Sequence, residues 1–204
     1  MKRVLSVFGT RPEAIKMAPL VKALDAYEGI KSLCCVTAQH RQMLDSVLEA
    51  FEIHPDADLD IMTPKQTLSL ITTKCLSGMD SVIETLKPDM ILVHGDTTTT
   101  FAVAVAAFYH QIPVGHVEAG LRTYDKYSPF PEEMNRKLVS SIADIHFCPT
   151  ESNKKNLQNE HTSGNIFITG NTAIDALKCT IQKDFVFSTS ELNTIDYKNK
   201  KVCL

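Results

Sequence analysis

Short apolar runs of strand length alternate with helical patterns along most of this 204-residue chain, and this alternation limits the possible folds more than any other feature. The strand-like runs lie at residues 4–8, 33–37, 58–62, 90–93, 113–117, 145–148 and 166–168. Residues 90–93 are uniformly apolar, as expected of a parallel strand buried on both faces. The alternation therefore predicts an α/β protein with a doubly wound, Rossmann-like parallel sheet. Ligands of such sheets bind outside the carboxyl ends of the strands.

A long, highly charged loop follows the fifth of these runs. It begins after Glu118 and ends where Glu132 and Glu133 open a helix that also carries Arg136. Compact domains join a strand to a helix in about 2–6 residues, so the length of this loop predicts a functional role. We expect its acids to face one crevice together with Arg122 and Arg136. A solvated surface excursion is the alternative.

The turn after the first predicted strand also carries unusual charge. Thr10 and Glu13 fit a capping box at the start of a helix. Arg11 and Lys16 lie in or near the first turn of that helix, where cations oppose the helix dipole. This conflict indicates an anionic ligand nearby, with solvated surface cations as the alternative. Asp96 follows the fourth predicted strand, where an aspartate fits a helix N-cap and equally a ligand contact.

Composition and missing motifs exclude several classes of function. A net charge of −3 offers no basic surface for general nucleic-acid binding. No apolar run is long enough for a membrane span or a signal peptide, so we expect a cytoplasmic protein. The six cysteines form no CxxC pair and are interpreted as buried free thiols. The chain has no GxGxxG, no P-loop and no metal-ligand spacing, so no cofactor and no metal are expected. His94 and His116 are interpreted as hydrogen-bonded packing residues.

Six sequence blocks, which follow one another in order along the chain, are similar to a known family. They read FGTRPEAIKMAPL, TAQHRQMLD, VHGDTTTT, GHVEAGLRT, PFPEEMNRK and ITGNTAIDAL. The chain resembles the non-hydrolysing UDP-N-acetylglucosamine 2-epimerases of bacteria. The resemblance implies a GT-B type fold, in which two Rossmann-like domains enclose the active site. It assigns residues 1–182 to the N-terminal domain, and 183–204 to a linker and the start of a truncated second domain. It also implies a missing C-terminal domain as partner, and a homodimer.

The resemblance further implies an activity and a set of site residues. The family converts UDP-GlcNAc reversibly to UDP-ManNAc, used in cell-surface polysaccharide biosynthesis, by eliminating UDP and adding it back with C2 inverted. Residues that match the family's catalytic and substrate-binding positions are Asp96, Glu118, Glu132 and Lys16 as catalytic groups, and Arg11 and Arg136 as substrate-binding cations. Carboxylates from separate loops suit a base on one face of the sugar and an acid on the other. The sequence leaves open which carboxylate removes the C2 proton.

Some members of the family bind a second UDP-GlcNAc as an activator. The matching positions here are Gln39, His40, Gln42, Gln66 and Thr67. Lys65 stands where those members have arginine, and lysine lacks the bidentate fork. Three other functions compete with the reversible epimerase: a hydrolysing epimerase, a non-catalytic nucleotide-sugar-binding module and a bare glycosyltransferase domain.

Overall fold

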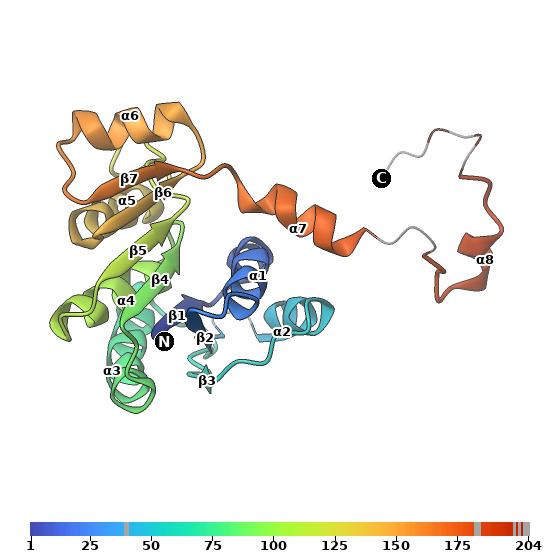
Figure 1. Ribbon diagram of the computed structural model, residues 1–204, viewed down its shortest axis with the longest axis horizontal. Helices are drawn as coiled ribbons and strands as arrows, with labels where there is room; N and C mark the ends of the chain where they lie inside the picture. Colours follow the sequence, from blue (N-terminus) through green and yellow to red (C-terminus); the bar gives the residue numbers. More distant parts are fainter. Residues whose placement is uncertain (39–40, 182–184, 198, 200, 202–204) are drawn as a thin grey trace.

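A single parallel sheet of seven strands organises the chain (Figure 1). The computed structural model describes residues 1–38, 41–181, 185–197, 199 and 201. The strands run in the order β3-β2-β1-β4-β5-β6-β7, with every neighbouring pair parallel. Their bounds are β1 Lys2–Phe8, β2 Ile30–Val36, β3 Ala57–Asp58, β4 Met90–His94, β5 Val114–Val117, β6 Ile145–Cys148 and β7 Asn165–Ile168. The predicted doubly wound sheet is confirmed, and its strand order reverses between β1 and β4.

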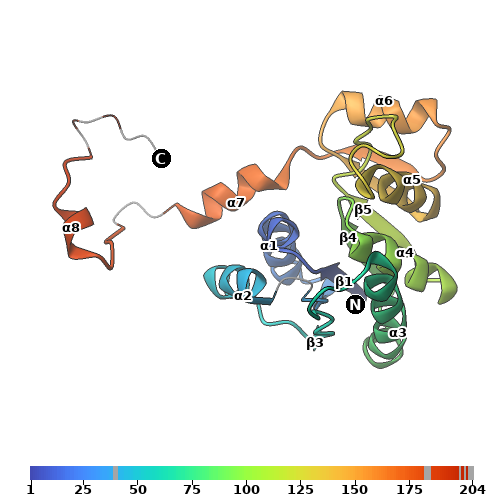
Figure 2. The same cartoon turned by 180° about the vertical axis from the view of Figure 1, so that it is seen from behind.

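Helices cover both faces of the sheet, as Figures 1 and 2 show. The bounds are α1 Arg11–Asp25, α2 Arg41–Ala50, α3 Leu68–Leu86, α4 Thr98–Tyr109, α5 Glu132–Ile142, α6 Glu151–Asn159, α7 Thr172–Thr180 and α8 Ser190–Asn193. One core cluster joins α1 and α2 to one face of the sheet, and a second joins α3, α4 and α5 to the other. Alanines of α4 are fully buried, which lets this helix approach the sheet closely.

Several sequence-based predictions need correction. The third strand is β3, Ala57–Asp58, rather than residues 58–62, because Asp60 takes a left-handed backbone (φ 42°) that ends the extended run. The segment predicted to be a linker and the start of a second domain contains the short helix α8. Cys179 is exposed, so the prediction of buried thiols holds for Cys34, Cys35, Cys75 and Cys148 only, and Cys203 lies outside the described residues.

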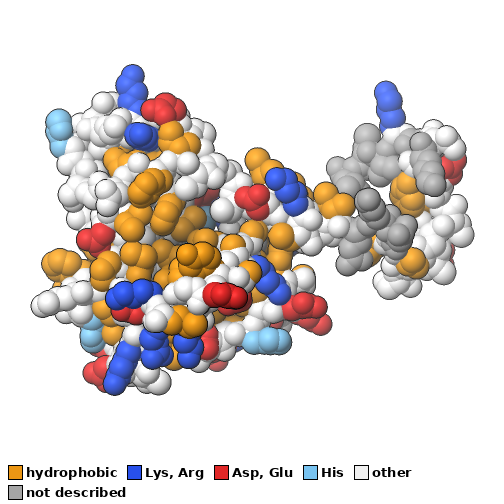
Figure 3. Space-filling model, in the orientation of Figure 1, with side chains coloured by type: hydrophobic (Ala, Val, Ile, Leu, Met, Phe, Trp, Pro, Cys, Tyr) orange, Lys and Arg blue, Asp and Glu red, His pale blue; other side chains and the backbone are white. Residues whose placement is uncertain are grey.

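An apolar groove of about 290 Å³ opens on the sheet face that carries α1. It is lined by α1 and by Leu92, Val117 and Phe147 of three adjacent strands. Phe167 of β7 stacks on Phe147, with ring centroids 6.3 Å apart, and is 52% exposed. Figure 3 shows apolar side chains gathered between α1 and β7. Within the described residues, the helical layer on this face is incomplete beyond β4.

The end of the described chain differs from the rest in its packing. Helix α7 packs along α1 and buries Ala176, whereas most residues from 185 to 197 are exposed. Of the helices in the described part of the chain, none has the length and apolar character needed to cross a membrane.

Candidate active site

Three adjacent strands, β1, β4 and β5, end at one edge of the sheet beside the point where the strand order reverses. Glu13 of α1 joins the turns that follow β1 and β4. Its buried Oε2 atom accepts hydrogen bonds from the backbone N–H groups of Gly9 (2.9 Å) and Thr10 (2.8 Å), which confirms the Glu13 half of the predicted capping box. Its Oε1 atom accepts from the hydroxyls of Thr97 (2.7 Å) and Thr100 (3.1 Å). Glu13 therefore fixes the turn after β1 to the turn after β4.

Glu118 lies directly after β5 and contacts Lys16 of α1. The Lys16 Nζ atom is 2.5 Å from Glu118 Oε1, and both side chains are mostly buried. Glu118 has a left-handed backbone (φ 62°), and its side chain lies near the C-terminal end of β4. The Nε2 atom of His94 is 3.7 Å from Glu118 Oε2. Lys16, which opposes the dipole of its own helix, thus has a carboxylate as its partner.

His94 is held as a neutral side chain beside this ion pair. Burial, reinforced by the charge of Lys16, lowers the pKa of His94 to about 3. Neither ring nitrogen of His94 has a hydrogen-bond partner among the described residues, so the expected hydrogen bond is missing. His116 does form one, between Nε2 and the carbonyl of Gly95 (2.7 Å), and burial lowers its pKa to about 3 as well. Both histidines are therefore uncharged near neutral pH.

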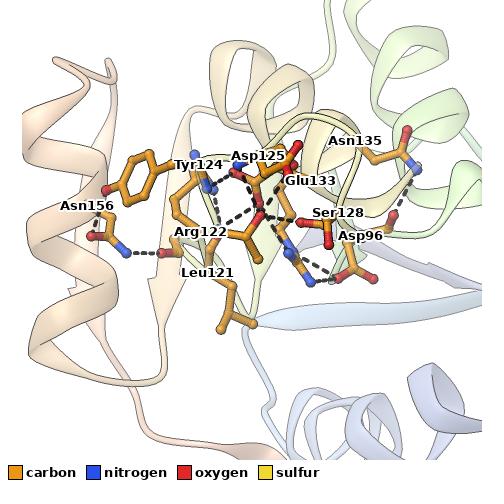
Figure 4. A network of polar contacts seen from close by, with 12 residues as sticks. Asp96, Leu121, Arg122, Tyr124, Asp125, Ser128, Glu133, Asn135 and Asn156 are labelled. Atoms are coloured by element: carbon orange, nitrogen blue, oxygen red, sulfur yellow. Dashed lines mark hydrogen bonds and ion pairs between the residues drawn. The ribbon is translucent and has the colours of Figure 1, made fainter. Parts of the chain in front are cut away.

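Asp96 follows β4 and is held by Arg136 of α5. The Arg136 Nε and Nη2 atoms donate to Asp96 Oδ2 at 2.9 and 2.5 Å, and the side-chain amide of Asn135 donates to the Asp96 carbonyl at 2.8 Å (Figure 4). The N-cap of α4 is Thr97, whose hydroxyl accepts from the N–H of Thr100. Capping as the role of Asp96 is therefore wrong, and its carboxylate binds Arg136 instead.

Glu133 anchors the long loop, a role that the sequence analysis missed. Its fully buried carboxylate accepts from the backbone N–H groups of Thr123 and Tyr124, both at 3.0 Å, and from Arg136 Nη1 at 3.2 Å (Figure 4). Burial alone would raise the pKa of Glu133, but these hydrogen bonds outweigh it and leave the pKa lowered. The only signal in the sequence is the pair of adjacent acids at a helix start, which does not tell which acid turns inward.

Arg122 does not join the crevice, so that prediction is wrong. Its side chain is completely buried and donates to Glu160 at the end of α6 (2.8 Å from Nη2) and to Ser140 of α5 (3.0 Å). A carboxylate partner distant in sequence draws the guanidinium away from Asp96 and Glu118. Arg122 thus attaches the start of the loop to the neighbouring helices.

Glu132 and Arg11 each begin a helix near the crevice. Glu132, the first residue of α5, is partly buried, and its buried Oε2 atom has no hydrogen-bond partner among the described residues. Arg11, the first residue of α1, is exposed and borders a groove of about 530 Å³ between α1, α2 and α7. Exposed Arg11 is open to a ligand and Glu132 has one unpaired buried oxygen, but the ion pairs at this edge are those of Lys16 with Glu118 and of Arg136 with Asp96.

The residues expected to bind an activator are only partly described. Gln39 and His40 lie outside the described residues. Gln42 is exposed in the first turn of α2. Gln66 accepts a hydrogen bond from the N–H of Thr63, and Thr67 is the N-cap of α3. Two of these five positions therefore also shape the turn that precedes α3.

The comparisons with known proteins identify the family. A family model described as UDP-N-acetylglucosamine 2-epimerase matches residues 22–204. The chain belongs to the UDP-N-acetylglucosamine 2-epimerase family. A UDP-N-acetylglucosamine 2-epimerase from Bacillus subtilis (strain 168) is 61% identical over 184 residues, or 90% of this chain and 48% of that protein.

Two solved structures share the fold of this chain. The UDP-GlcNAc 2-epimerase from Neisseria meningitidis bound to UDP-GlcNAc is 58% identical, with a TM-score of 0.82 over 86% of this chain and 48% of that chain. The co-structure of S. aureus MnaA with UDP is 56% identical, with a TM-score of 0.86 over 92% and 50%. This epimerase-family chain spans about half the length of the curated relatives that it matches, which agrees with one half of a two-domain fold.

Proposed function

We propose that this chain is the N-terminal half of an enzyme that interconverts UDP-GlcNAc and UDP-ManNAc. The observation that carries the proposal is the pair of carboxylate–cation contacts, Glu118 with Lys16 and Asp96 with Arg136, at adjacent strand ends. The N. meningitidis structure, bound to UDP-GlcNAc, and the S. aureus structure, with UDP, agree with a nucleotide-sugar ligand. A carboxylate that can exchange a proton, beside a cation that can bind a diphosphate, is what an elimination of UDP requires.

The proposed reaction removes and restores two bonds of the sugar. One carboxylate takes the proton from C2, the C2–H electron pair forms a C1=C2 double bond, and the C1–O bond breaks with its electron pair leaving on UDP. UDP then adds back at C1 while a second carboxylate delivers a proton to the opposite face of C2. We assign the proton transfers to Asp96, Glu118 and Glu132, which come from three different elements.

The cations have a separate role in this scheme. Negative charge grows on the diphosphate as the C1–O bond breaks, and preorganised cations stabilise it most in a site that excludes water. Lys16 and Arg136 already lie beside the carboxylates, and exposed Arg11 lies at the N-terminus of α1, where a helix favours an anion. We therefore propose Lys16 as a catalytic cation, and Arg11 and Arg136 as substrate-binding residues.

The domain organisation and the assembly are also proposals. We assign residues 1–182 to the first domain and 183–204 to a linker and the start of the second. The packing of α7 on α1 and the exposure of most residues from 185 to 197 support this division. We further propose that the protein is a homodimer, because family members commonly are. The buried free thiols of Cys34, Cys35, Cys75 and Cys148 agree with a reducing cytoplasm.

One experiment tests the proposed function. UDP-GlcNAc is incubated in deuterated water with this chain, and with this chain joined to the second half of the B. subtilis relative, and the sugar is followed by proton NMR. Deuterium should enter C2 only with the joined protein, together with UDP-ManNAc. No exchange with either protein, at concentrations that bind the sugar nucleotide, would leave a binding module instead. Release of free ManNAc with UDP would assign the hydrolysing reaction.

We also propose that a second UDP-GlcNAc binds as an activator at Gln39, His40, Gln42, Gln66 and Thr67. The exposure of Gln42, and of Lys65 next to Gln66 in sequence, supports a ligand surface at these residues. In the joined protein, the Gln42→Ala variant should need a higher UDP-GlcNAc concentration for activation. An unchanged dependence of the rate on UDP-GlcNAc would refute this site.

A further inference from the structure

Glu133 lies behind the proposed catalytic groups and contacts the residue that holds one of them. Its Oε2 atom accepts from the N–H of Thr123 and from Arg136 Nη1, and its Oε1 atom accepts from the N–H of Tyr124. The side chain has no exposed surface, so these three contacts replace the water that an ionised carboxylate would otherwise bind. Loss of these contacts would leave a buried charge without partners, so replacing Glu133 shows what the contacts hold in place.

The guanidinium of Arg136 bridges two carboxylates. Its Nη1 atom donates to Glu133, while Nε and Nη2 donate to one oxygen of Asp96. Because the guanidinium is planar and its donors are fixed relative to each other, the bond to Glu133 sets the orientation of the edge that meets Asp96. A lysine at this position could not make both contacts in one geometry.

The same carboxylate fastens the long loop to α5. Glu133 binds two consecutive N–H groups of the loop, and the Thr123 hydroxyl donates to the Ser128 carbonyl at 2.5 Å, which draws the far side of the loop inward. A second anchor, Arg122 with Glu160, attaches the start of the loop to α6 and has no contact with Asp96. A change at Glu160 therefore disturbs the loop alone, whereas a change at Glu133 disturbs both the loop and the contact of Arg136 with Asp96.

We propose that Glu133 is a positioning residue, which aligns Arg136 on Asp96 and couples that alignment to the folded state of the loop from residue 119 to residue 130. Glu133 reaches the reaction only through Arg136 and Asp96. The catalytic part of this inference depends on the proposed epimerase function. The geometric part depends only on the contacts of this chain.

The geometric part is tested in this chain by hydrogen exchange measured by NMR. In the Glu133→Gln variant, which keeps the shape but loses the charge and one acceptor oxygen, exchange of the Arg136 Nε–H should accelerate at least about tenfold, because the bond from Nε to Asp96 weakens when the guanidinium loses its alignment. The matched Glu160→Gln variant should change it less than about twofold, because its carboxylate binds the other arginine. Equal acceleration in both variants, or none in Glu133→Gln, would overturn the proposal.

The catalytic part is tested by the turnover of the joined protein. Glu133→Gln should lower kcat about 10- to 100-fold, with a smaller change in KM, because the misplaced group is Asp96. Glu133→Asp keeps the charge with a shorter reach, and it should recover part of the lost kcat; it also replaces Glu133→Gln if that variant does not fold. A kcat within about twofold of the parent in both variants would overturn a positioning role. If the parent itself shows no turnover, the proposed function fails while the exchange measurement still decides the geometry.

Discussion

Replacing the buried carboxylate of Glu13 should destabilise the chain strongly. The side chain is 3% exposed and accepts four hydrogen bonds. Two come from the N–H groups of Gly9 and Thr10, and two come from the hydroxyls of Thr97 and Thr100 after β4. Each charged bond contributes about 1.5–3 kcal/mol, whereas a neutral one contributes about 0.5–1.5 kcal/mol. For the two N–H bonds alone, Glu13→Gln should therefore lower the free energy of unfolding by about 2 kcal/mol.

Glu13→Ala should have a larger effect, because it removes every acceptor. The N–H groups of Gly9 and Thr10 then lie buried without partners, at about 1–3 kcal/mol each, so the expected loss is about 4 kcal/mol. Urea unfolding followed by circular dichroism measures both variants. Glu28→Gln, at an exposed position of the turn after α1, is the control and should stay within about 0.5 kcal/mol of the parent. A Glu13→Gln variant as stable as this control would refute the hydrogen-bond assignment.

Three further predictions follow from the same edge of the sheet. Burial and the charge of Lys16 hold the pKa of His94 near 3, so below about pH 6.5 the unfolded state binds more protons than the folded state. The free energy of unfolding should therefore fall as the pH drops from about 6.5 towards 3, by up to about 1.4 kcal/mol per pH unit. A His94→Gln variant should lose the contribution of His94 to this pH dependence. Gly120→Ala should lower the melting temperature by several degrees, because φ is 87° and the new Cβ would collide with the carbonyl of Asn153. Lys16→Met in the joined protein should lower kcat about 100-fold through loss of the cation beside Glu118, and an unchanged kcat in the NMR assay would remove Lys16 from the mechanism.

Most of the sheet could be predicted from the sequence because the signals are local. Residues 90–93 are apolar throughout, which fits a strand covered on both faces. Helix α3 is likewise bounded by local features, because Thr67 caps its first turn and Lys87 leaves the helix in a left-handed conformation just before Pro88. The third strand was harder to place, since the left-handed backbone of Asp60 interrupts a pattern that continues in sequence.

The contacts of the site depend on partners that are distant in sequence. An aspartate after a strand has the same local pattern whether it caps a helix or binds Arg136, and only the position of α5 decides for Asp96. Arg122 likewise has no local feature that predicts its pairing with Glu160. The role of Glu133 follows from the path of the loop above it, which the sequence does not define.

The left-handed backbone of Glu118 affects how stabilised variants of the protein should be selected in the laboratory. Only glycine and, less readily, asparagine and aspartate adopt this conformation at low energy, so glutamate here costs about 1 kcal/mol of stability. Glu118→Gly relieves this strain but leaves the mostly buried Lys16 without its carboxylate partner, so a library sorted for heat resistance alone should accept it only together with a neutral residue at position 16, and so discard two proposed catalytic groups. Stabilised variants should be selected for turnover at the same time, with position 118 kept as glutamate.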